Sequence, residues 1–256
     1  MWWQNRNKTL AEDPTSSGQS LAHNGERANG FRGRFSERDS RAQFGTITND
    51  VPRSLLAKVY ALLAFSLAVT AAGGFLGYRL DPVWILLSLP VALGLIFLID
   101  RLREVDGWNV VLLYTFCLLN GLLIGTVLAG FVGAGMTNIV LQAGVATLAV
   151  TVAMSLIGLT LKQDLTAWGS FLYTALIGLV GVFIANIFIG QSLISLVASA
   201  FAVGLFSLFL IFDTNRIRRT PDTMGNAVMI TLDIYLDIVN LFLNLLNLLA
   251  NLSGDD

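Results

Sequence analysis

The last apolar segment of this chain carries carboxylate and amide side chains along one side. Six polar residues recur there at spacings of 4, 3, 4, 3 and 4, and they are Asp233, Asp237, Asn240, Asn244, Asn247 and Asn251. On a helix that turns about 100° per residue, all six fall within about 40° of one line. A carboxylate at the middle of a membrane helix costs about 2.5–3.5 kcal/mol on insertion scales, so this side should not face lipid. The pattern predicts a helix at the centre of a bundle, with its polar side lining a polar space.

Six further apolar segments precede this one, so the chain is expected to cross a membrane seven times. The composition agrees, because 55% of the residues are hydrophobic and 13% are charged, whereas soluble domains have about 25% charged residues. Each segment is long enough, or nearly so, to span a bilayer. The predicted spans are 54–78, 83–99, 109–131, 138–161, 169–188, 193–212 and 228–251. The predicted fold class is therefore an all-α membrane protein, a seven-transmembrane-helix bundle whose short loops make consecutive helices antiparallel.

The Lys and Arg residues predict which end of the bundle faces the cytoplasm. Of the 16, only Arg79 falls on one side of the membrane, and all others fall in the N-terminal region or in loops on its side. Cytoplasmic loops carry an excess of Lys and Arg, so the N-terminus is expected to be cytoplasmic. Seven spans then place the C-terminus outside.

The chain divides into three regions. Residues 1–52 lack periodicity and large apolar clusters, so we expect a disordered cytoplasmic tail. Residues 53–252 form the predicted seven-helix domain, and 253–256 a short exterior C-terminus. The only histidine, His23, lies in the tail, and the only cysteine, Cys117, lies in an apolar stretch. No disulfide, thiolate or histidine metal site and no cofactor is therefore expected.

Three acids lie in or beside the last two spans: Asp213 at the end of the sixth, and Asp233 and Asp237 in the seventh. Asp237 lies about 15 Å into its helix, so it meets Asp213 only if the sixth helix continues or the two helices are offset. Two close carboxylates cannot both ionise easily and tend to share a proton, which would make the pair a pH sensor. In the alternative, Asp213 caps its helix and pairs with Arg216 or Arg218 at the surface, and Asp237 makes an inert buried hydrogen bond.

Asn240 and Asn244 adjoin these acids and, with Asp233, are candidates for lining a cation path. Carboxylate and amide oxygens suit hard cations such as Ca²⁺, which takes about 6–8 oxygen ligands. Asp213 and Asp237 are the candidate transient calcium ligands in a loose, incomplete site. Weak binding of this kind suits passage better than storage.

The outer asparagines and several glycines have a packing interpretation. Asn247 and Asn251 are expected to hold helices together by hydrogen bonds, each typically worth less than about 2 kcal/mol. Gly73–Gly77 and Gly121–Gly125 both fit a GxxxG pattern, which favours internal helix packing over a dimer interface.

The last two spans resemble the Bax inhibitor-1 family (the TMBIM proteins and their bacterial relatives). The resemblance rests on Phe212-Asp213-Thr214-Asn215 and on a quite specific YLDxxNLF element, Tyr235-Leu236-Asp237-Ile238-Val239-Asn240-Leu241-Phe242. Further matches are Lys162-Gln163-Asp164-Leu165, Trp168-Gly169-Ser170-Phe171-Leu172 and Lys58-Val59-Tyr60. The resemblance covers about residues 53–252.

The resemblance implies a seven-helix bundle with the last helix at its centre, surrounded by the other six. Bacterial members look like pH-sensitive calcium leak channels of the inner (plasma) membrane, in which the aspartates matching Asp213 and Asp237 form the sensor. In those members an arginine at the cytoplasmic end of the second span latches the pair in the closed form. The matching residue here is Arg103 or Arg101, and the distance to Tyr114 favours Arg103.

Two residues depart from the family pattern. Asp233 adds an acid one turn before Asp237, where relatives usually have an apolar or amide residue, and it is expected to shift the pH response. Asn247 stands where many relatives carry arginine, which makes the outer end less positive.

The main expectation is a membrane cation leak, chiefly for Ca²⁺, with lipid and calcium ions as its partners and no nucleic acid. The alternative is a membrane-embedded regulator that acts through membrane-protein partners. Some bacterial relatives look like modulators of a membrane protease, and eukaryotic ones like suppressors of cell death. An enzyme is not expected, because Ser66, Ser155 and Ser207 have no histidine partner in the membrane.

Overall fold

The structure is a computed structural model that describes residues 53–80, 83–103, 105 and 107–253. For residues 83–89 it describes the backbone alone. The predicted tail, 1–52, and the final residues, 254–256, lie outside the described part of the chain, so their expected disorder and location stay predictions.

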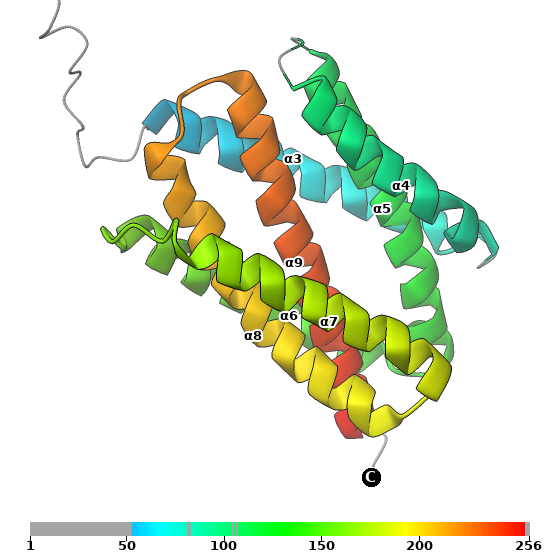
Figure 1. Ribbon diagram of the computed structural model, residues 1–256. Coiled ribbons are helices and arrows are strands. Elements are labelled where there is room, and N and C mark those ends of the chain that lie inside the picture. Colours follow the sequence, from blue (N-terminus) through cyan, green and yellow to red (C-terminus); the bar gives the residue numbers. More distant parts are fainter. Residues whose placement is uncertain (1–52, 81–82, 104, 106, 254–256) are drawn as a thin grey trace, which may run out of the picture. The chain divides into compact units, whose positions relative to one another are not determined.

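Within the described residues, the chain forms seven long helices and one short 3₁₀ helix (Figure 1). They are α3 (Arg53–Gly77), α4 (Val83–Arg101), α5 (Trp108–Gly133), α6 (Thr137–Thr160), α7 (Trp168–Ile189), α8 (Ser192–Arg216), η1 (Ile217–Arg219) and α9 (Met224–Ser253). Each long helix coincides with one predicted apolar segment. The largest differences are at the α8–α9 connection, where α8 continues to Arg216 and α9 already begins at Met224.

Six of these helices are long and apolar enough to cross a membrane, so the chain is an integral membrane protein. Among the described residues, α4 is the long helix that is not one of the six. It has 19 residues and contains Pro90. The seventh crossing and the orientation of the termini remain predictions.

The last helix, α9, is the most enclosed. About two thirds of its apolar window is buried (67%), whereas the corresponding fraction is 39% or less for the other five candidate spans. Its main neighbours are α8, α3, α6 and, less extensively, α5, while α4 packs on α5 and α7 packs on α8. In Figure 1, α9 passes between these helices. The last helix is therefore central, as predicted. It is not surrounded evenly by the other six helices, however, because α4 and α7 pack mainly on α5 and α8.

Tyr235 fixes which face of α9 points toward α3 and α5. Its side chain is fully buried, its hydroxyl lies 2.8 Å from the Thr70 hydroxyl of α3, and its ring meets Phe116 of α5 edge to face. Tyr235 lies about 160° around the helix from Asp237. The polar side of α9 is thereby directed away from α3 and α5.

Ion pairs tie the α8–α9 connection to the loops beside it. Asp222 accepts hydrogen bonds from the hydroxyl of Ser54 and, at 2.9 Å, from Nζ of Lys58 at the start of α3. These two groups hold the pKa of the Asp222 carboxyl below its ordinary value. Arg219 lies 3.3 Å from Asp164 in the α6–α7 loop. These contacts connect the α8–α9 connection to the start of α3 and to the α6–α7 loop.

Helices α3 and α5 approach each other at the two predicted GxxxG pairs. A Cβ atom at Gly121 would collide with the Thr70 carbonyl oxygen, and one at Gly73 would lie 2.5 Å from the Leu118 carbonyl oxygen. The glycine pairs therefore pack within the chain, as predicted. At Gly178 of α7, by contrast, an added Cβ atom would meet no atom of the described residues within 4 Å.

Replacing Gly121 by alanine should destabilise the protein by about 1–3 kcal/mol, because the added methyl group meets backbone that cannot rotate away. Gly178→Ala is the matched control and should be neutral or slightly stabilising, since alanine favours a helix by up to about 1 kcal/mol over glycine. Unfolding in detergent micelles measures both. Equal stabilities of the two variants would contradict the close α3–α5 packing.

Candidate functional site

Asp213 of α8 and Asp237 of α9 lie together inside the bundle. They are 3% and 6% exposed, and both carboxyl groups line the same cavity. Two buried carboxyl groups that lie close together cannot both ionise easily and tend to share one proton. Oδ1 of Asp213 and Oδ2 of Asp237 are buried without a hydrogen-bond partner in the described part of the chain.

The two acids meet because α8 continues beyond its apolar segment. The helix runs through Asp213 to Arg216, and the connection then extends through η1 before α9 begins at Met224. The Thr214 hydroxyl donates to the Leu210 carbonyl oxygen at 2.6 Å, and the Asn215 amide donates to the Leu161 carbonyl oxygen at 2.7 Å. These bonds stabilise the polar last turn of α8, so the first of the two alternative conditions for the meeting, a longer sixth helix, is fulfilled.

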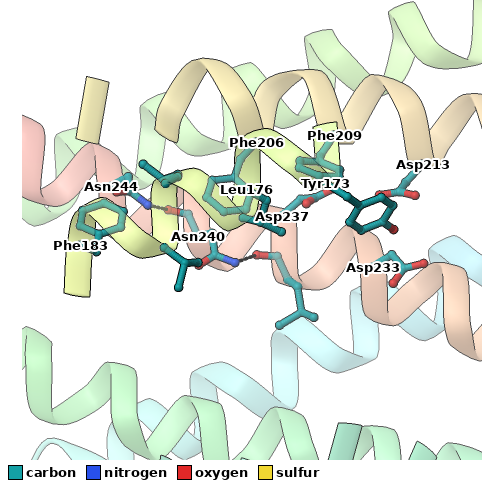
Figure 2. A pocket seen from close by; sticks show the side chains of 13 residues that line it. Tyr173, Leu176, Phe183, Phe206, Phe209, Asp213, Asp233, Asp237, Asn240 and Asn244 are labelled. Carbon is teal, nitrogen blue, oxygen red and sulfur yellow. Dashed lines mark hydrogen bonds between the residues drawn. The ribbon is translucent and has the colours of Figure 1, made fainter. Parts of the chain in front are cut away.

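A cavity of about 290 Å³ lies beside the pair, between α7, α8 and α9. Its polar lining consists of Asp213, Asp233, Asp237, Asn240 and Asn244, and apolar and aromatic side chains complete the walls. Figure 2 shows the acids toward one end of the cavity and Asn244 toward the other. All five residues were predicted as site residues, and the structure brings them to one space.

The two cavity asparagines direct their amide nitrogens toward the backbone of α9. Asn240 donates to the Leu236 carbonyl oxygen and Asn244 to the Asn240 carbonyl oxygen, both at 2.8 Å (Figure 2). The amide oxygens are then the polar atoms that these side chains can offer to the cavity. Oxygen atoms of this kind are ligands for hard cations.

The outer asparagines do not line the cavity. The Asn247 amide donates to the hydroxyl oxygens of Ser195 and Ser199 of α8, at 3.1 and 3.0 Å, and Asn251 donates to the backbone and side-chain oxygens of Asn247. The predicted role of Asn247 as a bond between helices is confirmed, whereas the same prediction for Asn251 is wrong, because its bonds stay within α9. The polar side of α9 therefore has two parts, one that lines a cavity and one that fastens α9 to α8.

Arg216 pairs with two of the three acids. Its Nη1 atom lies 3.1 Å from Oδ2 of Asp233 and 3.8 Å from Oδ1 of Asp213. The alternative expectation, in which Asp213 pairs with Arg216, is thus met in addition to the contact between Asp213 and Asp237. Asp213 is, however, buried and not at the surface. The contact with Asp233 was not predicted.

The two candidate latch arginines lie at the end of α4. Arg101 is the last residue of this helix and is exposed, and Arg103 forms an ion pair with Asp100 at 3.9 Å. The Arg103 carbonyl oxygen accepts a hydrogen bond from Asn109 and touches α9 at Gly225. This segment therefore packs against the first turn of α9, and the latch role of either arginine stays a prediction.

Among the described residues, no group of three or more acids, histidines or cysteines is placed to hold a metal ion. The carboxylates of the cavity thus do not form a closed metal cage.

The structure adds Tyr173 of α7 to the site. Its ring lines the cavity near the acids and packs edge to face on Phe209 of α8 (Figure 2). No spacing rule within the last two helices could have identified it, since it belongs to a different helix. Its only signal in the sequence was its place directly after the family-like segment 168–172.

Comparisons with known proteins agree on one family. The profile described as "Inhibitor of apoptosis-promoting Bax1" matches residues 52–254. The Golgi anti-apoptotic protein of vaccinia virus is 31% identical over 77% of this chain and 84% of its own length. Bax inhibitor 1 of Schizosaccharomyces pombe is 29% identical over 79% of this chain and 78% of its own. An uncharacterized membrane protein of Vibrio cholerae is 29% identical over 82% of this chain and 97% of its own length. The match covers the whole helical region, including the acids and the cavity, and this chain therefore belongs to the Bax inhibitor-1 family of integral membrane proteins.

Proposed function

We propose that this protein is a cation leak of the bacterial inner membrane, chiefly for Ca²⁺, and that the proton shared by Asp213 and Asp237 controls its opening. The observation that carries the proposal is a buried pair of carboxyl groups at the wall of a cavity inside a membrane protein. Intramembrane acids are costly and mark ion or proton pathways.

The lining of the cavity supports cations as the permeant species. Asp213, Asp233 and Asp237 supply carboxylate oxygens, and Asn240 and Asn244 add amide oxygens farther along the same wall. Ca²⁺ prefers such ligands and tolerates irregular geometry. Since the described residues form no closed cage around the ion, it can leave the site again.

The shared proton supplies the link to pH. With the proton present, the two carboxyl groups can form a hydrogen bond that connects α8 to α9. Without it, two negative charges face each other, and repulsion replaces the bond. Asp233, Arg216 and Tyr173 are the other titratable or charged groups at this end of the cavity, so the macroscopic titration belongs to the whole group.

The variant Asp237→Asn tests whether the acid pair is the pH sensor. An amide imitates the protonated carboxyl group and cannot titrate. The calcium flux of the variant should therefore vary by less than about twofold across the pH range in which the wild-type flux changes. At every pH, the calcium flux of the variant should equal the wild-type flux at the lowest pH of the range. Asp213→Asn should behave likewise. Fluorescent-dye-loaded liposomes measure the flux from about pH 6 to 8, and a wild-type-like pH profile in both variants would refute the sensor.

A second prediction concerns the bond between α8 and α9 at the far end of the cavity. Asn247→Ala removes two hydrogen bonds to Ser195 and Ser199. At about 0.6 kcal/mol per membrane hydrogen bond, or about 1.2 kcal/mol for the two, their loss should raise the leak about sevenfold while its pH dependence persists. Asn251→Ala is the control, because its bonds stay within α9. The same flux assay applies, and a leak no greater than that of the control would show that this fastening does not restrict the path.

The second candidate function is regulation through protein partners. It is favoured by the names of two relatives, the Golgi anti-apoptotic protein of vaccinia virus and Bax inhibitor 1 of Schizosaccharomyces pombe. Such a regulator would act on a membrane protease or on a stress or cell-death pathway. It would need an exposed surface or the N-terminal region rather than the cavity.

Deletion of residues 1–50 separates the two functions. Because the cavity lies entirely in α7, α8 and α9, the deletion should leave liposome flux and its pH profile unchanged. Flux of the shortened protein is compared with that of the full chain at equal reconstitution density. Loss of flux on deletion would contradict a path confined to the helical bundle and favour the regulatory function.

A further inference from the structure

Arg216 does not itself line the cavity, but it pairs with two of the acids that do. Its guanidinium bridges Asp233, at 3.1 Å, and Asp213, at 3.8 Å. The exposed side-chain fraction decreases from Arg216 (44%) through Asp233 (26%) to Asp213 (4%). The arginine is thus the most solvent-accessible member of the group, and the acids lie progressively deeper behind it.

We propose that Arg216 is a tethered counter-ion at the mouth of the cavity, which an entering cation must displace before it reaches the carboxylates of Asp213 and Asp233. The inference rests on the proposed function, because it assigns the entry step of the same path. It also gives the extra acid, Asp233, a role: the arginine makes its hydrogen bond with Asp233 and not with Asp213.

The chemistry follows from competition for the same oxygens. A guanidinium group donates to carboxylate oxygens in the positions where a hard cation would bind. Arginine does not lose its charge in proteins, so this counter-ion stays cationic at every pH. It can give way only by rotation of its side chain, and its half-exposed position leaves room for that rotation.

Arg219 provides a matched control at the same end of the bundle. It carries the same charge three residues farther on, but its ion pair is with Asp164 and its hydrogen bond is with Asn215. Neither of these residues lines the cavity. Its removal therefore changes the net charge equally without opening the contact with Asp213 and Asp233.

The test measures access of a cation to the cavity directly. A cysteine is introduced at Leu176, which lines the cavity between the acids and Asn244 (Figure 2). The native Cys117 is fully buried and gives little background. The rate of labelling by a membrane-impermeant, positively charged thiol reagent is then compared with that of a negatively charged reagent of similar size.

In the Arg216→Gln background the cationic reagent should react about fivefold faster or more, whereas the anionic reagent should gain less, because a unit positive charge next to the path has been removed. Arg216→Lys keeps the charge on a shorter side chain and should give an intermediate rate, which keeps the test decisive if the glutamine variant does not fold. Arg219→Gln should leave the rate unchanged. An unchanged rate in Arg216→Gln, or an equal increase in Arg219→Gln, would overturn the proposal.

Calcium flux of the same variants separates this proposal from the leak itself. Faster labelling in Arg216→Gln without flux in any variant would support the role of Arg216 at the cavity mouth and refute the leak function. Flux in the wild type with unchanged labelling in Arg216→Gln would refute the role of Arg216 alone.

Discussion

A carboxyl group inside a membrane has to be enclosed by protein, and this constraint organises the bundle around α9. Asp237 is placed on one side of α9, and that side is covered by α7 and α8. On the opposite side, Tyr235 is fully buried between α3 and α5. The two sides together account for the enclosure of α9, because neither its acids nor its tyrosine hydroxyl could be left facing lipid without a cost.

Different contacts join α8 to α9 beyond the two ends of the cavity beside Asp237. At one end, Arg216 bridges Asp213 and Asp233 through charge. At the other, Asn247 fastens α9 to two serines of α8 through neutral hydrogen bonds. Asp213, Asp237 and two asparagines supply the polar lining between them. This short polar space fits the proposed slow passage of ions better than a wide, permanently open pore.

Much of this arrangement could be predicted from the sequence. Long apolar runs determine helices in lipid because every backbone group has to be satisfied within its own segment, so the helix positions followed from hydropathy. The 4-3 spacing of Asp233, Asp237, Asn240 and Asn244 placed them on one face, since a helix has a fixed period. That face does line a cavity.

The rest depended on tertiary contacts. Hydropathy falls at Asp213, yet α8 continues because Thr214 and Asn215 bond to carbonyl oxygens of α8 and of the α6–α7 loop. Only this continuation lets Asp213 meet Asp237. Likewise, Arg216 and Asp233 are 17 residues apart on different helices, so no period within one helix could have paired them.

The central claim is that Asp213 and Asp237 share a single proton inside the membrane. Infrared difference spectroscopy during a pH titration tests it most directly, because a protonated carboxyl group has a carbonyl stretching band that an ionised one lacks. One such band is expected in the wild type; it should disappear as the pair loses its proton and be altered in both Asp213→Asn and Asp237→Asn. Absence of a protonated carboxyl band near neutral pH, or a band that is unchanged in both variants, would contradict it.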